Sequence, residues 1–274
     1  AVLDEVRVDW KKWNGYYRKI PEIQSVIDRK AMWTVGRGFK SRTKTKEILD
    51  RIRGNGKDTF DTIMHNGVRV YTICGNFFAE IIKNKRGELR NLKPLDPSTI
   101  IILGNDKGII KGYRQEIPSL TGKDSIIEFE PESIFHLSWN RLANHLEGMG
   151  TIEKLEDIIL MRNEALADMK IVFHRYVKPI IISSVDTDDA AEVEEYKKKL
   201  DKAVALGENL VVPKGTVDKM ERMSIPQYST LDPLPWIQLL QKQFIVAEGV
   251  PEVVLGAGAE TTEASAKILY LAFQ

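Results

Sequence analysis

The amino-acid sequence predicts an α+β protein in which two long helices flank a small α/β insert. Short apolar runs alternate with glycine-containing turns between residues 68 and 137, a pattern typical of antiparallel hairpins. A much longer helical pattern begins at Thr151, and another helix follows from about residue 232. The polar stretch between them has the size of a projecting subdomain. These features favour a structural role over a catalytic one.

The composition is that of an ordinary globular protein, with 43% hydrophobic and 29% charged residues. No apolar run approaches the roughly 20 residues that cross a bilayer, so we expect no membrane association. The first ten residues lack the apolar block of a signal peptide. Cys74 is the single cysteine, which excludes an internal disulfide and a Cys-rich zinc site. We expect it to be a small residue buried in a strand, in a protein made in a reducing compartment.

Positive charge gathers between Gly36 and Lys57, although the net charge of the chain is only +1. Eight basic residues stand there against two acidic ones: Arg37, Lys40, Arg42, Lys44, Lys46, Arg51, Arg53 and Lys57. Such a segment could contact phosphates. It could equally be a solvated helix face with the i,i+4 pairs Lys46–Asp50 and Glu47–Arg51.

The first third of the chain reads as three helices. Pro21 begins the first, because Ile23, Val26 and Ile27 then recur at helical spacing. The second is expected over residues 44–53, ending at Gly54, and the third over residues 58–66, ending at Gly67.

Residues 68–74 either finish a helix or begin a strand. Beyond them the sequence predicts one small antiparallel sheet, with strands at residues 77–82, 89–92, 99–103, 109–113, 126–129 and 134–137. The first two strands are joined by Asn84-Lys-Arg-Gly87, where Gly87 supplies the positive φ that such a turn requires.

The longest helical pattern runs from Thr151, its expected N-cap, to just before Pro179. Its apolar stripe comprises Ile152, Leu155, Ile158, Ile159, Leu166, Met169, Val172 and Phe173. About 27 residues at about 1.5 Å each span roughly 40 Å. This length favours packing against neighbouring molecules, while a helix that crosses between two domains is the alternative.

The insert, about residues 180–230, is expected to contain a strand at 180–185 and a charged helix at 190–206 with an apolar seam of Val193, Tyr196, Leu200 and Val204. Two further strands, at 210–213 and 217–223, are expected about the Lys214-Gly215 turn. A helix then covers residues 236–248 and ends at Gly249. A loop rich in small residues follows, and a last helix begins near Ala264.

The common catalytic motifs are absent from the sequence or incomplete in it. The sequence has neither a P-loop nor an HExxH motif. His145-Leu-Glu147 resembles half of a zinc deaminase motif without its cysteines, and Ser41-Arg-Thr-Lys44 matches Ser-x-x-Lys by spacing alone. The four histidines lie far apart and are expected to pack in the core or on the surface. We therefore predict no enzyme activity, no metal site and no cofactor.

Four segments occur in an informative order. The first is GNFFAEI at 75–81 with the turn NKRG at 84–87 and LKPLDP at 92–97, and the second is FEPESIFHL at 129–137. The third is GMG at 148–150 before the long helix, and the fourth is VAEGVP at 246–251 followed by Leu255 and Gly256. Together, across about 200 residues, these segments resemble the portal proteins of tailed double-stranded DNA viruses and proviruses.

The resemblance implies a ring of about twelve subunits at one vertex of a viral capsid. It assigns residues 1–150 to an outer wing, 151–177 to a first stem helix, 178–231 to a clip, 232–249 to a second stem helix, 250–263 to a tunnel loop, and 264–274 to the start of a helix directed towards the wing or crown. The loop residues facing DNA would be Gly256, Ala257, Gly258, Ala259, Glu260, Thr261, Thr262 and Glu263.

The resemblance also implies partners. Double-stranded DNA would pass through the ring without sequence specificity during packaging and ejection. The terminase large subunit, and later the head–tail adaptor, would dock on the insert through Glu194, Glu195, Lys197, Lys198 and Lys199. Capsid and scaffold proteins would be further partners, and Arg37, Lys40, Arg42 and Lys44 are candidates for contact with the capsid or with phosphate. The subunit would assemble in the host cytoplasm and reside in the virion.

Two features depart from the family pattern. The last helix is still running at Gln274, which suggests that the protein continues, whereas the family normally continues through a longer helix into a crown, which is missing here. The tunnel loop carries Glu260 and Glu263 but no basic residue before Lys267. Acidity suits a conduit, because few phosphate contacts let DNA slide, although a solvated surface loop is the simpler interpretation.

Two other functions remain open from the sequence. One is an enzyme whose site lies in the α+β region, although no set of nucleophile and base supports it. The other is a monomeric nucleic-acid-binding or scaffold protein that uses the basic segment 36–57.

Overall fold

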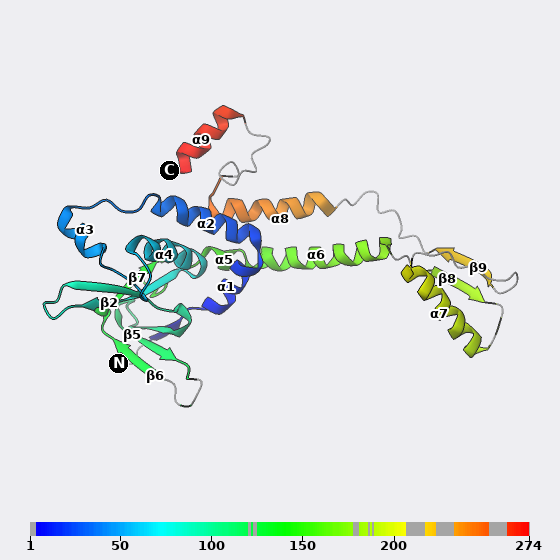
Figure 1. Cartoon of the computed structure of the whole chain (residues 1–274), viewed down its shortest axis with the longest axis horizontal. Coiled ribbons are helices and arrows are strands. Elements are labelled where there is room, and N and C mark those ends of the chain that lie inside the picture. Colours follow the sequence, from blue (N-terminus) through cyan, green and yellow to red (C-terminus); the bar gives the residue numbers. More distant parts are fainter. Residues whose placement is uncertain are drawn as a thin grey trace. The chain divides into compact units, whose positions relative to one another are not determined.

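The computed structural model describes residues 4–119, 122, 125–177, 181–185, 187, 189–206, 217–222, 233–251 and 262–273. The chain divides into two compact units (Figure 1). Residues 1–159 with 240–274 form the first, here called the body, and residues 160–239 form the second, here called the insert unit. Helices α6 (Glu156–Val177) and α8 (Pro233–Glu248) contribute residues to both.

The N-terminal part of the body carries four helices: α1 (Trp10–Lys19), α2 (Pro21–Val35), α3 (Thr43–Leu49) and α4 (Phe60–Cys74). Helix α2 confirms the expected start at Pro21, and Ile23, Val26 and Ile27 are buried on its inner face. Helix α3 stops four residues short of the expected end. Helix α1 was not predicted from the pattern of apolar residues.

Helix α4 corrects the expected third helix, which was placed over 58–66 with a stop at Gly67. The helix begins with a capping box between Thr59 and Thr62 and continues through Gly67 to Cys74. Gly67 does not end the helix but makes room, since a Cβ there would lie 3.2 Å from the ring of Phe77. The true stop is Gly75, whose φ of +83° is the left-handed conformation of a helix C-terminus.

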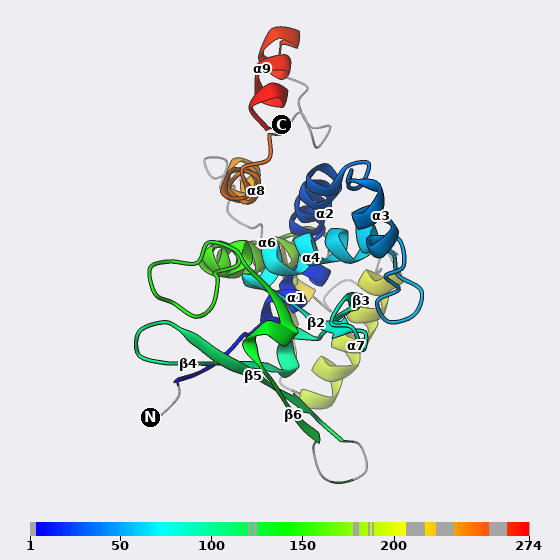
Figure 2. The same cartoon turned by 90° about the vertical axis from the view of Figure 1, so that its left-hand side faces the viewer.

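The strands of the body form two sheets (Figure 2). The first sheet has the order β1-β4-β5-β6, and its strands are β1 (Asp4–Arg7), β4 (Ile100–Gly104), β5 (Ile110–Ile117) and β6 (Ser125–Phe129). The second has the order β3-β2-β7, with β2 (Asn76–Lys83), β3 (Leu89–Pro94) and β7 (Ile134–Ser138). All neighbouring strands are antiparallel. Short 3-10 turns at Pro97–Thr99 and Pro131–Ser133 lead from one sheet to the other.

The expectation of one sheet was therefore wrong, although every expected strand between 77 and 137 exists. Strand β7 pairs with β2, with Phe77 opposite Leu137, and not with the preceding β6. The missed strand β1 pairs with β4. Both pairings join segments far apart in sequence, which local patterns do not reveal.

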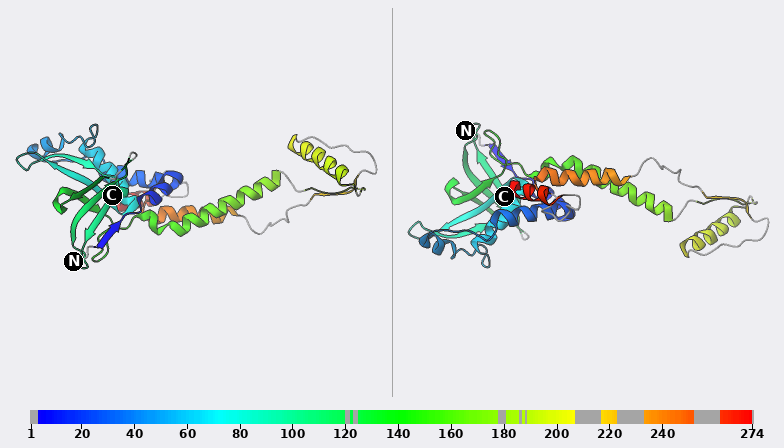
Figure 3. Two further views of the ribbon diagram at one scale, coloured as in Figure 1. Left: turned by 90° about the horizontal axis from the view of Figure 1, so that it is seen from below. Right: turned by 90° about the horizontal axis from the view of Figure 1, so that it is seen from above.

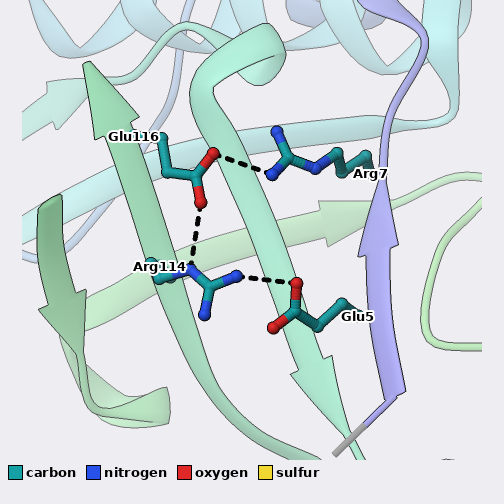
Figure 4. A network of polar contacts seen from close by, with 4 residues as sticks. All are labelled: Glu5, Arg7, Arg114 and Glu116. Atoms are coloured by element: carbon teal, nitrogen blue, oxygen red, sulfur yellow. Dashed lines mark hydrogen bonds and ion pairs between the residues drawn. The ribbon is translucent and has the colours of Figure 1, made fainter. Parts of the chain in front are cut away.

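A network of charged side chains crosses the first sheet (Figure 4). Glu5 and Arg7 on β1 reach over β4 to Arg114 and Glu116 on β5, with nitrogen–oxygen distances of 2.7 Å for Arg114–Glu5 and for Arg7–Glu116. Arg114 also approaches Glu116 at 3.3 Å, which links the two pairs. Such partly exposed pairs contribute little singly, so the network mainly fixes the position of β1 on the sheet.

The body holds two apolar clusters. One lies between the helices and the second sheet and includes Ile27, Ile73, Phe77, Ile152 and Phe244. The other lies between the two sheets and is built around Phe78, Ile102 and Tyr113. Figure 2 shows α2 and α4 on one side of the strands. The C-terminal part of α8 joins the body as well, because Phe244 is buried in the first cluster and Gln241 Nε2 donates to Glu22 Oε1 at 3.2 Å.

The insert unit contains β8 (Ile181–Val185), α7 (Ala190–Leu206) and β9 (Val217–Arg222) (Figure 3). Strand β9 pairs antiparallel with β8. Asp189 caps α7 by accepting from the amide of Ala191 at 2.9 Å. The strand expected at 210–213 lies outside the described residues. In α7, Tyr196 is buried as expected, but Val193 is exposed and Ala203 takes a buried position instead.

Helix α9 (Glu263–Phe273) belongs to the body and confirms the helix expected near Ala264. Tyr270 on this helix meets Trp33 on α2 edge to face, with ring centroids 5.0 Å apart. Within the described residues, no helix is both long and apolar enough to cross a membrane.

Candidate assembly and docking surfaces

Just before the long helix, the backbone around Gly148 and Gly150 passes very close to the end of α4 and to Trp139. The three glycines at this crossing, Gly75, Gly148 and Gly150, are here called the glycine junction. A Cβ on Gly148 would collide with the carbonyl oxygens of Trp139 and Gly75, and one on Gly150 with the carbonyl of Ile73. The amide of Trp139 donates to Gly75 O at 2.7 Å, and Met149 N donates to Trp139 O at 2.9 Å. Only glycine allows backbones to approach this closely.

Asn76 holds the junction together from a fully buried position, with 1% of its surface exposed. Its Oδ1 accepts from the amide of Gly148 at 2.9 Å and from His136 Nε2 at 3.0 Å. Its Nδ2 donates to the carbonyls of Gly148 at 3.1 Å and Cys74 at 3.3 Å. One side chain thus pairs both backbone groups of Gly148.

His136 extends this network to the first sheet. Because Asn76 Oδ1 is an acceptor, His136 Nε2 carries the proton, and Nδ1 accepts from the hydroxyl of Tyr113 at 3.1 Å. Burial lowers the pKa of His136 to about 4, with Arg141 adding to the effect. Burial likewise raises the pKa of Tyr113 to about 12. Both groups are therefore neutral at pH 7, as hydrogen-bonded core residues are.

Cys74 also lies at this junction. It is buried as expected, but it is the last residue of α4 and not part of a strand. Burial raises the pKa of its thiol to about 12, so the nucleophilic thiolate does not form at pH 7.

The start of the long helix differs from the expectation. Gly150 is the N-cap, and Thr151 is the first helical residue, whose buried hydroxyl donates to Thr72 O at 2.9 Å. The helix is also interrupted once: α5 (Thr151–Lys154) ends at Leu155, and α6 follows. The amide of Leu155 donates to the carbonyl of Ile152, an i→i−3 bond that tightens this turn while Leu155 stays in the core.

The apolar stripe of the helix divides into two parts. Ile152, Leu155 and Ile159 are fully buried in the body. Beyond them, apolar side chains are exposed in the single chain, with 40% of Leu166 and 61% of Phe173 accessible. Further exposed residues of this kind are Leu160, Met161 and Ile171 on α6, Trp236, Leu239 and Val246 on α8, and Ile268, Leu269, Tyr270 and Leu271 on α9. Uncovered apolar surface of this extent is typical of an interaction site.

The residues predicted to dock partners on the insert lie together on α7. Glu194, Glu195, Lys197, Lys198 and Lys199 are all exposed. Lys199 pairs with Glu195 at 2.8 Å, and the hydrogen bond between them lowers the pKa of Glu195. Lys198 approaches Glu194 at 4.0 Å. The surface therefore presents charges of both signs in i,i+4 pairs.

The predicted tunnel loop is described only at its end. Gly256, Ala257, Gly258, Ala259, Glu260 and Thr261 lie outside the described residues. Thr262 precedes α9, and its Oγ1 accepts from Ser265 N at 3.4 Å. Glu263 is the first residue of α9, where it pairs with Lys267 at 2.9 Å, so its expected place in a loop was wrong.

The predicted phosphate or capsid contacts Arg37, Lys40, Arg42 and Lys44 are all exposed. Neither expected pair, Lys46–Asp50 or Glu47–Arg51, occurs among the ion pairs of the described residues, because α3 ends at Leu49. Between α3 and the hairpin of β2 and β3 lies a groove of about 890 Å³. Arg90 on that hairpin faces the same groove as Lys44 and Arg51, a proximity that sequence reasoning missed because the two segments are about 40 residues apart.

Metal-ligating side chains do not cluster in the part of the chain that the structure describes. His65 is partly buried, which lowers its pKa, and His145 lies 3.9 Å from Glu147 on the surface. The site residues found here therefore hold backbones together or present surfaces.

The sequence matches the family model of phage portal proteins over residues 31–274. The chain belongs to the phage portal protein family. No significant match to a curated protein was found.

Solved structures share the fold. A chain in the neck of a native gene transfer agent particle, computed with C12 symmetry, superposes with a TM-score of 0.65 at 14% identity, covering 97% of this chain and 77% of that one. The crystal structure of an HK97 family phage portal protein from Corynebacterium diphtheriae gives a TM-score of 0.60 at 10% identity, covering 94% and 84%. These likenesses confirm the α+β portal-type fold expected from the sequence.

A first prediction concerns the glycine junction. Gly148→Ala places a methyl group against two carbonyl oxygens and should lower the free energy of unfolding by about 2–4 kcal/mol. The matched control is Gly15→Ala, since Gly15 lies inside α1 with open space around it. That change should be neutral or stabilise by up to about 1 kcal/mol. Urea denaturation of both variants tests this, and equal stabilities would contradict the described packing.

A second prediction concerns pH. The pKa of His136 is about 4 in the folded protein against 6.5 ordinarily, so the unfolded chain binds a proton first as the pH falls. Stability should therefore decrease between pH 6.5 and pH 4, by on the order of 3 kcal/mol at the acid end. His136→Gln should remove this part of the slope in urea titrations at pH 7.0 and 4.5, whereas His145→Gln on the surface should leave it. An unchanged slope in His136→Gln would refute the assignment; the smaller contribution of His65 remains in both variants.

Proposed function

We propose that this protein is the subunit of a portal ring, a conduit through which double-stranded viral DNA enters and leaves a capsid. The observation that carries this proposal is the exposed apolar surface of α6, on which Ile159 is buried while Leu166 and Phe173 are open to solvent. In a ring, an identical neighbour covers such a surface. Membership of the portal family and the C12 symmetry reported for the similar particle neck support a ring of about twelve copies.

In this proposal, residues 1–150 form the wing, 151–177 and 232–249 the two stem helices, 178–231 the clip, 250–262 the tunnel loop and 263–274 the start of a further helix. The division of the chain near residues 159 and 240 supports this arrangement, since it separates the insert from the rest. The ring sits at the capsid vertex of a virion, where capsid and scaffold proteins contact the wing.

The clip receives the terminase large subunit during packaging and the head–tail adaptor afterwards. The exposed charges of α7 support this role, because paired charges of both signs favour rapid association and specificity over raw affinity. Two partners that bind the same surface in turn require association that is fast and specific but not too tight to be reversed. Hydrolysis of ATP belongs to the terminase, and the ring itself contributes no catalytic group.

In this proposal the tunnel loop, residues 256–262, faces DNA together with Glu263 at the start of α9. This segment carries Glu260 and Glu263 and no basic residue, which limits the number of phosphate contacts, so DNA can slide through.

The second candidate is a monomeric nucleic-acid-binding or scaffold protein. The exposed Arg37, Lys40, Arg42 and Lys44 favour it. It leaves the apolar surfaces of α6 and α9 without a function, and a protein of this kind would remain a monomer at micromolar concentration.

The ring proposal predicts that Leu166→Glu abolishes assembly. A charge at this position would be buried without a partner in the ring but exposed in the free chain, so helical content should be unchanged while the assembly collapses to monomers. Leu166→Met keeps the apolar surface and should assemble normally. Light scattering after size exclusion measures both. Assembly of the Glu variant at wild-type mass would contradict the proposed interface.

The docking proposal predicts that reversing the charges of Lys197, Lys198 and Lys199 to glutamate spares ring assembly and weakens terminase binding by at least about tenfold. Native gels report the rings, and pull-down with terminase reports docking. Loss of the rings themselves would count against a docking role for this surface.

A further inference from the structure

The groove between α3 and the β2–β3 hairpin lies in a strongly basic part of the body. Residues 36–61 and 80–93, which build its surroundings, hold thirteen basic residues against six acidic ones, although the whole chain has a net charge of only +1. The groove itself is lined by Lys44, Glu47, Ile48, Arg51, Arg53, Asn84, Glu88, Leu89, Arg90 and Asn91.

Hydrogen bonds fix the two walls of the groove relative to each other. Asn91 Oδ1 on β3 accepts from the amides of Arg53 at 3.0 Å and Gly54 at 2.9 Å, and its Nδ2 donates to Gly54 O at 2.9 Å. On the hairpin, Asn84 Oδ1 accepts from the amides of Arg86 and Glu88. The backbone segments on the two sides of the groove are therefore held together by hydrogen bonds of the fold.

The cations of the groove are available to a ligand. Lys44, Arg51 and Arg90 are exposed and take part in none of the ion pairs within the described residues. Arg53 donates from Nη1 to the carbonyls of Asp50 at 2.6 Å and Ile52 at 2.8 Å, which orients its guanidinium without neutralising it. Four positive charges thus point to an anionic partner.

The remaining lining distinguishes between kinds of anion. Ile48 is 37% exposed and Leu89 is half-buried, so the floor between the cations offers apolar contact. Glu47 and Glu88 also line the groove and repel anions, most strongly a polymer that carries a negative charge on every unit, whereas a segment with fewer charges can place them away from these carboxylates. Glu88 is held there, because Asn84 Nδ2 donates to its Oε2 at 2.8 Å. Duplex DNA would meet both carboxylates and leave Ile48 and Leu89 uncovered.

We propose that this groove binds an acidic, amphipathic polypeptide segment of a partner protein. Carboxylates of the segment pair with Arg51, Arg53, Arg90 and Lys44, and its apolar side chains rest on Ile48 and Leu89. Recognition of acidic motifs by arginine clusters uses the same chemistry. The inference does not require a ring, since every residue of the groove belongs to the body of one chain.

The test uses the full chain and three labelled probes in fluorescence anisotropy at about 150 mM salt. The first is a peptide of alternating Glu and Leu pairs, the second is the same peptide with Gln for Glu, and the third is a short DNA duplex. The acidic peptide should bind at least about tenfold tighter than the other two. Tighter binding of the duplex would overturn the proposal in favour of nucleic acid, and equal binding of the two peptides would overturn it too.

Variants localise the site. Arg51→Glu with Arg90→Glu should weaken binding of the acidic peptide at least about tenfold. The same change of charge at Lys107 and Lys111, which are exposed on the β4–β5 hairpin of the other sheet, should leave binding within about twofold. Ile48→Ser should weaken binding of the acidic peptide several-fold and leave binding of the DNA duplex unchanged. Equal losses in the groove and control variants would sink the proposal. Light scattering on each variant separates this outcome from any failure of assembly.

Discussion

The body of this subunit depends on the hydrogen bonds that Asn76 makes to Gly148. Both backbone groups of Gly148 are buried against Asn76, and the same side chain is bonded to His136 on the second sheet. Through Tyr113, His136 joins the first sheet to the same network. Removing the amide would leave several buried polar groups unsatisfied, each at a cost of about 1–3 kcal/mol. Two sheets and the segment entering the long helix are therefore held by one residue.

This arrangement explains how the long helix is anchored at its start. The close crossing at Gly75, Gly148 and Gly150 sets where the helix begins, and Thr151 ties its first turn to α4. Ile152, Leu155 and Ile159 then anchor it in the apolar core. Leu166 and Phe173, farther along the same helix, are exposed, so their apolar side chains can serve an interface. Firm anchoring and uncovered surface belong to one helix, as the ring proposal requires.

The sequence predicted those parts of the fold that local chemistry determines. Pro21, Gly87 and Gly249 mark a helix start, a turn and a helix end in the structure as expected, and α7 has the expected bounds. Features that depend on contacts between distant segments were not predicted. Glycine commonly ends helices, so Gly67 was predicted as a helix stop; its packing against Phe77, ten residues later, was not visible in the local pattern. Threonine commonly caps helices, so Thr151 was predicted as an N-cap; its hydrogen bond to Thr72 joins segments far apart in the sequence. Division of the strands into two sheets likewise rests on pairings that no single segment encodes.

The candidate surfaces follow the same rule. The charged surface of α7 could be predicted from the sequence because all of its residues lie on one helix. The groove could not, because it brings Arg51 together with Arg90 from a separate hairpin. An uncharged, buried Asn76 gave no signal of its importance; its position directly after a helix-ending glycine was the available hint.

The central claim is that identical neighbours cover the exposed face of the long helix in a closed ring. Class averages of the purified protein, imaged by electron microscopy along the particle axis, test it most directly. The account predicts a ring with an open centre and about twelve copies, the number that matches the C12 symmetry reported for the similar neck structure. A population of single, well-folded monomers at micromolar concentration would contradict it.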